Sequence, residues 1–140
     1  MKQINQRVVV GGVIIHENKV LIVQRSSDEE AYPDLWEVPS GKKEPLEKVT
    51  DAILREVKEE TGLVTEIIKI IDTFNFSVEK PDEIRDVTQI NFLLKLIGSS
   101  DVKLSSEHQN FAWITKDEIN NYNLSIETKN SIKQSFRSML

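Results

Sequence analysis

The first part of the chain has the hydrophobic pattern of a β-hairpin. Arg7 to Ile15 is rich in β-branched residues, and a polar turn over residues 16–19 separates it from a second apolar run, Val20 to Val23. Short apolar runs joined by a polar turn are typical of paired strands. Gly11 and Gly12 interrupt the first run, which indicates either a β-bulge or a close approach by a neighbouring group.

A polar loop and a short strand lead from this hairpin to a helix. Ser26 to Pro33 is polar, Leu35 to Val38 is apolar, and Pro39-Ser40-Gly41 predicts a turn. The apolar residues that follow have helical spacing and define an inward arc: Leu46, Val49, Ile53 and Val57. Pro45 suits a first helical turn, and Gly62 suits a left-handed C-cap. We therefore expect a helix from Leu46 to Thr61.

The second half of the chain predicts strands followed by helices. Val64 to Phe76 and Val87 to Ile97 have strand-like patterns, and polar residues 77–86 between them indicate an exposed loop. Further elements are expected as a strand over residues 111–114, a short helix capped by Thr115, and a terminal helix over residues 125–138 with Ile126, Ile132 and Phe136 inward. Strands on both sides of a central helix predict an α/β fold with a mixed sheet, in one domain over residues 1–140.

Three glutamates crowd one face of the expected central helix. Glu56, Glu59 and Glu60 are spaced so that their side chains lie within reach of one another. Such clusters are often solvated surfaces. Here, however, Glu60 falls inside the apolar arc and Glu56 lies at its edge, and carboxylates directed inward are rarely tolerated unless they are paired or bind a metal. A hard divalent cation would relieve the repulsion.

Composition narrows the choice of metal and partner. The 140 residues are 39% hydrophobic and 29% charged, with no cysteine, two histidines and a net charge of −5. Thiolate sites are excluded, and oxygen ligands favour Mg²⁺, with Mn²⁺ as the alternative. The acidic balance and the absence of a basic stripe argue against binding DNA. No apolar run reaches the length of about 18 residues needed to cross a membrane, and we expect a cytoplasmic protein.

The segment GKKEPLEKVTDAILREVKEETGL resembles the Nudix box of the Nudix hydrolases, a family that includes MutT-like enzymes. All nine specified positions are filled: Gly41, Glu47, Arg55, Glu56, Val57, Glu59, Glu60, Gly62 and Leu63. Weaker similarity continues in LIVQRS, in LWEVPSGKKE and in EHQNFAW. The resemblance implies a Nudix-type α/β/α sandwich with a mixed central sheet. It does not assign a substrate subgroup.

The resemblance also implies roles for residues of the box. Glu56, Glu59 and Glu60, with the carbonyl of Gly41, would bind the metal. Arg55 belongs to the catalytic group as an orienting partner, and it would join Glu47 in holding the loop to the helix. Glu47 and Gly62 are therefore structural members of the box.

Two glutamates are candidates for the general base, and the sequence does not decide between them. Glu56 lies between other carboxylates, which raises its pKa toward a useful value. Glu107 stands in a loop before a predicted strand, where family members often place a catalytic or metal-binding glutamate; a solvated loop acid is the alternative reading. His108, beside Glu107, is expected to be a loop or packing residue.

Other residues are candidates for contacting the phosphates and the base of a nucleotide substrate. Arg25 and Lys42 are candidates for binding substrate phosphates, with an ordinary surface role as the alternative for each. Four aromatic residues could stack on a base or pack in the core: Tyr32, Trp36, Phe74 and Phe76.

Together these features predict a metal-dependent pyrophosphohydrolase. Its substrate would be a nucleoside diphosphate linked to another group, above all a nucleoside triphosphate or an oxidised nucleotide. The alternative is a Nudix-fold domain that binds nucleotide as a sensor without turning it over. Removal of pyrophosphate from RNA 5′ ends is a further alternative, less compatible with the net charge. The sequence leaves the oligomeric state open, a homodimer included.

Overall fold

The computed structural model describes residues 1–139 of the chain. Seven strands form one mixed sheet: β1 Gln3–His16, β2 Lys19–Arg25, β3 Trp36–Glu37, β4 Ser40–Lys42, β5 Val64–Glu79, β6 Glu83–Ile97 and β7 His108–Ile114. The main strand order is β3-β2-β1-β6-β5, with β4 paired to β1 and β7 paired to β2. The β1 and β6 strands are parallel, and the other pairs are antiparallel.

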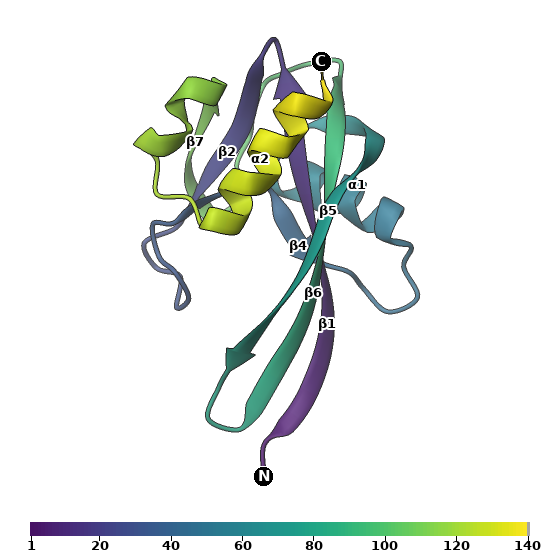
Figure 1. The fold of residues 1–140 in the computed structure, drawn as a ribbon, viewed down its shortest axis with the longest axis vertical. Coiled ribbons are helices and arrows are strands. Elements are labelled where there is room, and N and C mark those ends of the chain that lie inside the picture. Colours follow the sequence, from purple (N-terminus) through teal and green to yellow (C-terminus); the bar gives the residue numbers. More distant parts are fainter. Residues whose placement is uncertain (140) are drawn as a thin grey trace.

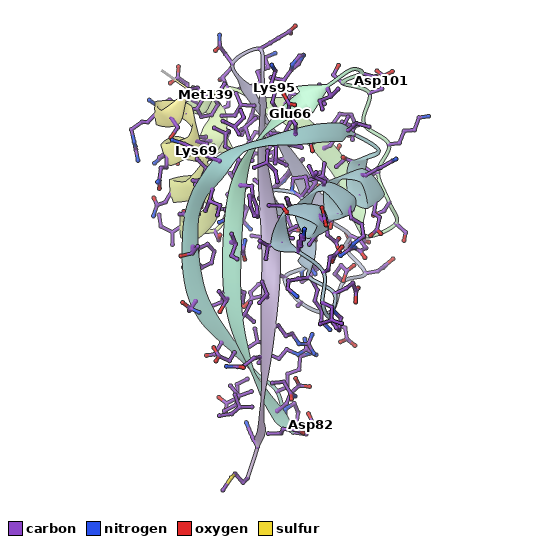
Figure 2. The ribbon with its side chains drawn as sticks, turned by 90° about the vertical axis from the view of Figure 1, so that its right-hand side faces the viewer. Glu66, Lys69, Asp82, Lys95, Asp101 and Met139 are labelled. Carbon is purple, nitrogen blue, oxygen red and sulfur yellow. The ribbon has the colours of Figure 1, made fainter. Side chains whose placement is uncertain are left out.

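Helices cover both faces of this sheet. Helix α1 runs over Val49–Thr61, the 3-10 helix η1 over Lys116–Asn121, and α2 over Ile126–Ser138. Figure 2 shows α1 and α2 on opposite sides of the strands. One apolar cluster includes Ile53 and Val57 of α1, and the other includes Ile132 of α2. The predicted α/β/α architecture with a mixed central sheet is therefore confirmed.

The expected N-terminal hairpin is also present. Ile15 pairs with Val20 across a turn in which Glu17 and Asn18 have positive φ. Pairing of β1 with β6 is regular through Gly11 and Gly12, so the glycines mark close approach rather than a bulge. A Cβ on Gly11 would strike the Asn91 side chain, and a Cβ on Gly12 would lie 2.7 Å from Leu94 Cδ1.

The expected start of the central helix is wrong. Helix α1 begins at Val49, and Leu46 is fully exposed with a φ of 66°. Instead of helix, residues 44–47 form a turn in which the Glu47 carboxylate accepts a hydrogen bond of 3.0 Å from the Glu44 N–H. Pro45 therefore lies in a loop. The expected end is confirmed, because Gly62 caps α1 with a φ of 75°.

The exposed loop expected over residues 77–86 is wrong as well. Strand β5 continues to Glu79 and β6 begins at Glu83. The polar residues are extended because β6 also pairs with β1 from Gln3 onward. These three strands form an arm that projects beyond the helices, with Asp82 at its tip (Figures 1 and 2).

Two smaller differences follow from pairing and capping. Ser40 and Gly41, expected in a turn, belong to β4, which pairs with β1. Ile126, expected to face inward, is 63% exposed because it is the first residue of α2, after the Ser125 N-cap. Ile132, two turns on, is fully buried as expected. Within residues 1–139 no helix is long and apolar enough to cross a membrane.

Candidate functional site

The three box glutamates differ sharply in exposure. Helix α1 buries Ala52, Ile53 and Val57 against the sheet, and Glu60 lies in the same buried arc, only 4% exposed. The Glu56 side chain is 14% exposed and that of Glu59 is 59% exposed. The helical period thus directs one carboxylate into the interior, holds a second at the boundary and leaves the third in solvent.

Arg55 ties the helix to the loop before it. Its Nε and Nη2 donate to the two Glu47 oxygens at 2.8 and 2.9 Å, and Nη2 also donates to the Lys42 carbonyl at 3.1 Å. Its Nη1 donates to Glu56 at 2.8 Å and to Glu59 at 3.2 Å. Hydrogen bonds from the Arg55 guanidinium lower the pKa of Glu47 to about 2, and the Glu47 carboxylate in turn raises the pKa of Arg55. This bidentate pair fixes residues 42–47 over α1.

Gly41 lies directly against Glu56. A Cβ added to Gly41 would collide with the Glu56 carboxylate, including Oε2, the oxygen that Arg55 does not bind. Pairing of β4 with β1 fixes this backbone position. The missing side chain therefore lets the loop backbone and a carboxylate of α1 share one small space.

Glu60 has no cationic partner among residues 1–139. Its Oε2 accepts a hydrogen bond of 3.1 Å from the Ser40 N–H, and its carboxylate forms no salt bridge within that range. Burial, followed by the nearby charge of Glu37, raises the pKa of Glu60 to about 9. A buried carboxylate with a single backbone donor is a site that a cation would stabilise.

Glu107 reaches the same region from a distant part of the chain. Its carbonyl accepts from the Ser26 N–H at 3.0 Å, while the Ser105 N–H donates to the Glu60 carbonyl at 3.1 Å. These bonds hold the loop beside the end of α1. Burial is the main cause that raises the pKa of Glu56 and of Glu60, and the charge of the exposed Glu107 carboxylate adds to both increases.

These carboxylates are neighbours but do not form a closed ligand cage. Residues 1–139 contain no group of three or more Asp, Glu, His or Cys side chains already placed around one point. The contacts of Arg55 explain part of this arrangement, because it draws Glu56 and Glu59 toward itself. Glu60 and Glu107 remain outside that ion-pair network.

The two candidate phosphate ligands are in different surroundings. Arg25 donates to the Ala31 carbonyl at 3.1 Å and to the carboxylates of Glu29 and Glu37 at 3.4 Å. It is therefore a partner of the acidic region. Lys42 is exposed and lines a separate pocket of about 470 Å³ with Lys43 and Arg7. The structure does not bring Arg25 and Lys42 together.

A second cavity of about 470 Å³ adjoins the acidic region. Its lining includes Glu37 and Ser40 at one side and Phe74, Phe76 and Gln89 on the sheet. The rings of Phe74 and Phe76 are 6.1 Å apart. Because Ser40 also bonds Glu60, the cavity reaches the backbone that contacts the buried carboxylate.

The aromatic candidates divide between this cavity and the core. Tyr32, 69% exposed, lines the cavity together with the two phenylalanines. Trp36 instead packs edge-on against Tyr122 with ring centres 4.9 Å apart and belongs to the core on the α2 side. Tyr32, Phe74 and Phe76 therefore remain the candidates for stacking on a nucleotide base.

Glu37 and His108 form a pair that sequence reasoning did not find. His108 is 6% exposed, and its Nε2 lies 2.9 Å from Glu37 Oε2, while Nδ1 is buried without a partner among residues 1–139. His108 is thus a packing residue, as expected, but one that contacts the acidic region. An acid within the apolar run Leu35 to Val38, just before the box, was the available signal for Glu37.

Comparison with known proteins gives consistent matches. The family model of the NUDIX domain matches residues 5–135. The nucleoside triphosphatase NudI of Escherichia coli K12 is 28% identical over 142 aligned positions, covering 91% of this chain and 95% of that protein.

Solved structures match over almost the whole chain. A MutT protein from Methanosarcina mazei Go1 superposes with a TM-score of 0.80 at 26% identity, covering 99% of this chain and 98% of that one. A MutT NUDIX hydrolase from Burkholderia pseudomallei superposes with a TM-score of 0.78 at 21% identity, covering 93% and 98%.

Proposed function

The chain belongs to the NUDIX family of hydrolases, and we propose that it hydrolyses nucleoside triphosphates to a monophosphate and pyrophosphate with the help of a divalent cation. The observation that carries this proposal is Glu60, a buried carboxylate without a cationic partner in residues 1–139, next to a cavity of nucleotide size. The name of the E. coli relative, a nucleoside triphosphatase, supports the same substrate class.

The donor set suits a hard cation. Glu60 lacks a cation, Glu56 keeps one oxygen that Arg55 does not bind, and the Gly41 backbone lies directly against that carboxylate. Carboxylate and carbonyl oxygens are the ligands of Mg²⁺ and Mn²⁺. We therefore assign the cation to Glu56, Glu59, Glu60 and the Gly41 carbonyl. Bound there, it would neutralise charge on phosphate oxygens and acidify a bound water.

The cavity accommodates the nucleoside. Phe74, Phe76 and Tyr32 offer faces for stacking, and Glu37 and Ser40 line the side that leads toward Glu60. A nucleoside in this cavity would direct its phosphates toward α1. Stacking tolerates any base, so the aromatic residues supply affinity rather than selection.

Glu107 is the better placed general base. Arg55 binds Glu56, whereas the Glu107 carboxylate is exposed and accepts no hydrogen bond within residues 1–139. Water adds to a phosphorus atom of the anhydride between the first and second phosphates, and its proton passes to the Glu107 carboxylate. The P–O bond of the anhydride breaks, and its electron pair stays on the departing phosphate oxygen. Atoms and charge are conserved in this step.

The test is a nucleotide panel with Mg²⁺ and matched glutamine variants. We expect release of pyrophosphate, a loss in kcat of about 10²–10⁴-fold in Glu107→Gln, the range of general-base catalysis, and a comparable loss in Glu56→Gln. Glu66→Gln is the control, because Glu66 is an exposed glutamate of β5 whose nearest cation, Lys95, is 4.0 Å away; Figure 2 labels both. Binding of nucleotides without turnover of any of them, as in a sensor, would overturn the proposal.

A further inference from the structure

A hydrogen-bonded chain of side chains runs along the α2 side of the sheet into the cavity, whose lining also includes Ser125, Glu127 and Thr128 at the start of α2. Asn91 Nδ2 donates to Asp72 Oδ1 at 2.9 Å, and Ser131 Oγ donates to Asp72 Oδ2 at 2.7 Å. Gln89 Nε2 donates to Asn91 Oδ1 at 2.9 Å. Asn91 and Ser131 are 2% and 1% exposed, while Gln89 lines the cavity.

The carboxylate at one end fixes the direction of every bond. An ionised carboxylate only accepts hydrogen bonds, so Asn91 must present its NH₂ group to Asp72 and its oxygen to Gln89. Gln89 must then present its own NH₂ group to Asn91. Flipping either amide would place two acceptors or two donors against each other inside the protein, which is costly.

The missing side chain of Gly11 leaves room for the Gln89 amide in this position. The Cβ position of Gly11 is 3.2 Å from Gln89 Nε2 and still closer to the Asn91 oxygen. Any side chain at residue 11 would push the two amides apart, so the glycine allows them to meet over the backbone of β1. One Nε2 hydrogen is thereby bound to Asn91 with Nε2 lying close to β1, and Oε1 is the acceptor of Gln89 that is left for a ligand.

The place of Gln89 in the cavity suits contact with the edge of a base. Gln89 is the direct cross-strand partner of Phe74, and Phe76 follows two residues along on the same face of β5. Gln89 Oε1 makes no hydrogen bond within residues 1–139 and is not among the fully buried unpaired atoms. A base stacked on Phe74 or Phe76 would bring its polar edge within reach of Oε1.

We propose that Gln89 is a specificity-determining residue that accepts a hydrogen bond from an exocyclic amino group of the base, with Asp72 and Asn91 as its positioning residues. The site therefore selects bases with an amino group at C6 of a purine or C4 of a pyrimidine, adenine and cytosine, over bases with a carbonyl oxygen at that position. A carbonyl there would place two acceptors against each other. This inference rests on the proposed function for its setting, the nucleotide cavity.

Two nucleotide pairs isolate the contact. CTP and UTP differ by an amino group against a carbonyl at one ring position, and ATP and ITP differ in the same way. For each pair we expect kcat/KM to favour the amino member about tenfold, the worth of roughly one hydrogen bond. The same preference is expected in the Kd values of the monophosphates CMP, UMP, AMP and IMP, which contain no anhydride to hydrolyse.

Three variants test whether the preference for amino-bearing bases depends on the hydrogen-bonded side chains of Asp72, Asn91 and Gln89. Gln89→Leu should bring both ratios close to one. Asp72→Asn should lower both ratios several-fold, because an amide at residue 72 allows the side-chain amides of Asn91 and Gln89 to flip. A circular dichroism spectrum checks that this variant is folded. Gln3→Leu, an exposed glutamine at the start of β1, should keep the wild-type ratios.

The outcomes separate this inference from the proposed function. Failure to hydrolyse any of the four triphosphates would refute the proposed function, and the monophosphate Kd ratios would still decide the role of Gln89. Equal affinity for CMP and UMP and for AMP and IMP would overturn the inference even in an active enzyme. Ratios unaltered by Gln89→Leu would do the same.

Discussion

Carboxylates on the two faces of the sheet are stabilised to different degrees by the rest of the protein. On the α2 side, the Asp72 carboxylate accepts two side-chain hydrogen bonds, from Asn91 and Ser131. On the α1 side, Glu60 accepts one backbone hydrogen bond and faces the charges of Glu37, Glu56 and Glu107. The first arrangement is complete without a ligand. The second is complete only when a cation is added, which is the physical distinction between a carboxylate that the protein already satisfies and a cation site.

The largest expected effect is on the α1 side. Glu60→Gln should lower kcat/KM by a factor on the order of 100 or more, because a neutral amide at this position weakens cation binding. The same variant should raise the free energy of unfolding of the metal-free protein near neutral pH, since it removes a carboxyl group that must take up a proton when the chain folds. Steady-state kinetics and urea unfolding in the presence of a chelator measure the two effects. An active variant would remove Glu60 from the proposed site.

The second largest effect should be a pH dependence of the stability of the metal-free protein, caused by the protonation of Glu60. Its pKa rises from an ordinary 4.5 to about 9 on folding, so between these values the folded state holds a proton that the unfolded state has released. The free energy of unfolding should therefore fall as the pH rises from about 5 to about 9, with no further contribution from Glu60 above that range.

Urea titrations at several pH values, again with chelator present, give this slope. Glu60→Gln should flatten it, and excess Mg²⁺ should reduce the loss near neutral pH. An equal slope in the wild type and the variant would assign the pH dependence to other groups.

The smallest effect is expected on the α2 side. Ser131→Ala removes the donor to Asp72 Oδ2 without creating a large cavity. The free energy of unfolding should fall by about 1–2 kcal/mol, the cost of leaving one acceptor unpaired in a half-buried site. Metal affinity, measured by titration calorimetry with Mn²⁺, should stay unchanged. A matching loss of metal affinity would show that the two faces are coupled and would break the comparison.

Local rules predicted the elements whose residues lie close together in the sequence. Helical period placed Glu60 in the buried arc and Glu56 at its edge, and the left-handed cap at Gly62 was predicted from the glycine at the end of the helical pattern. The prediction of where α1 starts was wrong, because the turn at residues 44–47 depends on the hydrogen bonds of Glu47 with Arg55 and Glu44. The loop predicted over residues 77–86 was wrong because this stretch is extended, and its β6 part pairs with β1, more than 70 residues away in the chain.

The sequence by itself determined the family, the α/β/α architecture and the acidic face of one helix, because each of these follows from spacing over a few turns or strands. Only the tertiary structure decided that Glu37 and Glu107 lie near Glu60, that Arg25 contacts Glu37, and that Gln89 reaches the cavity with a fixed amide. These relations join residues far apart in the chain. They depend on which strands pair and on how close Gly11 and Gly41 let side chains approach, and neither is encoded in a local pattern.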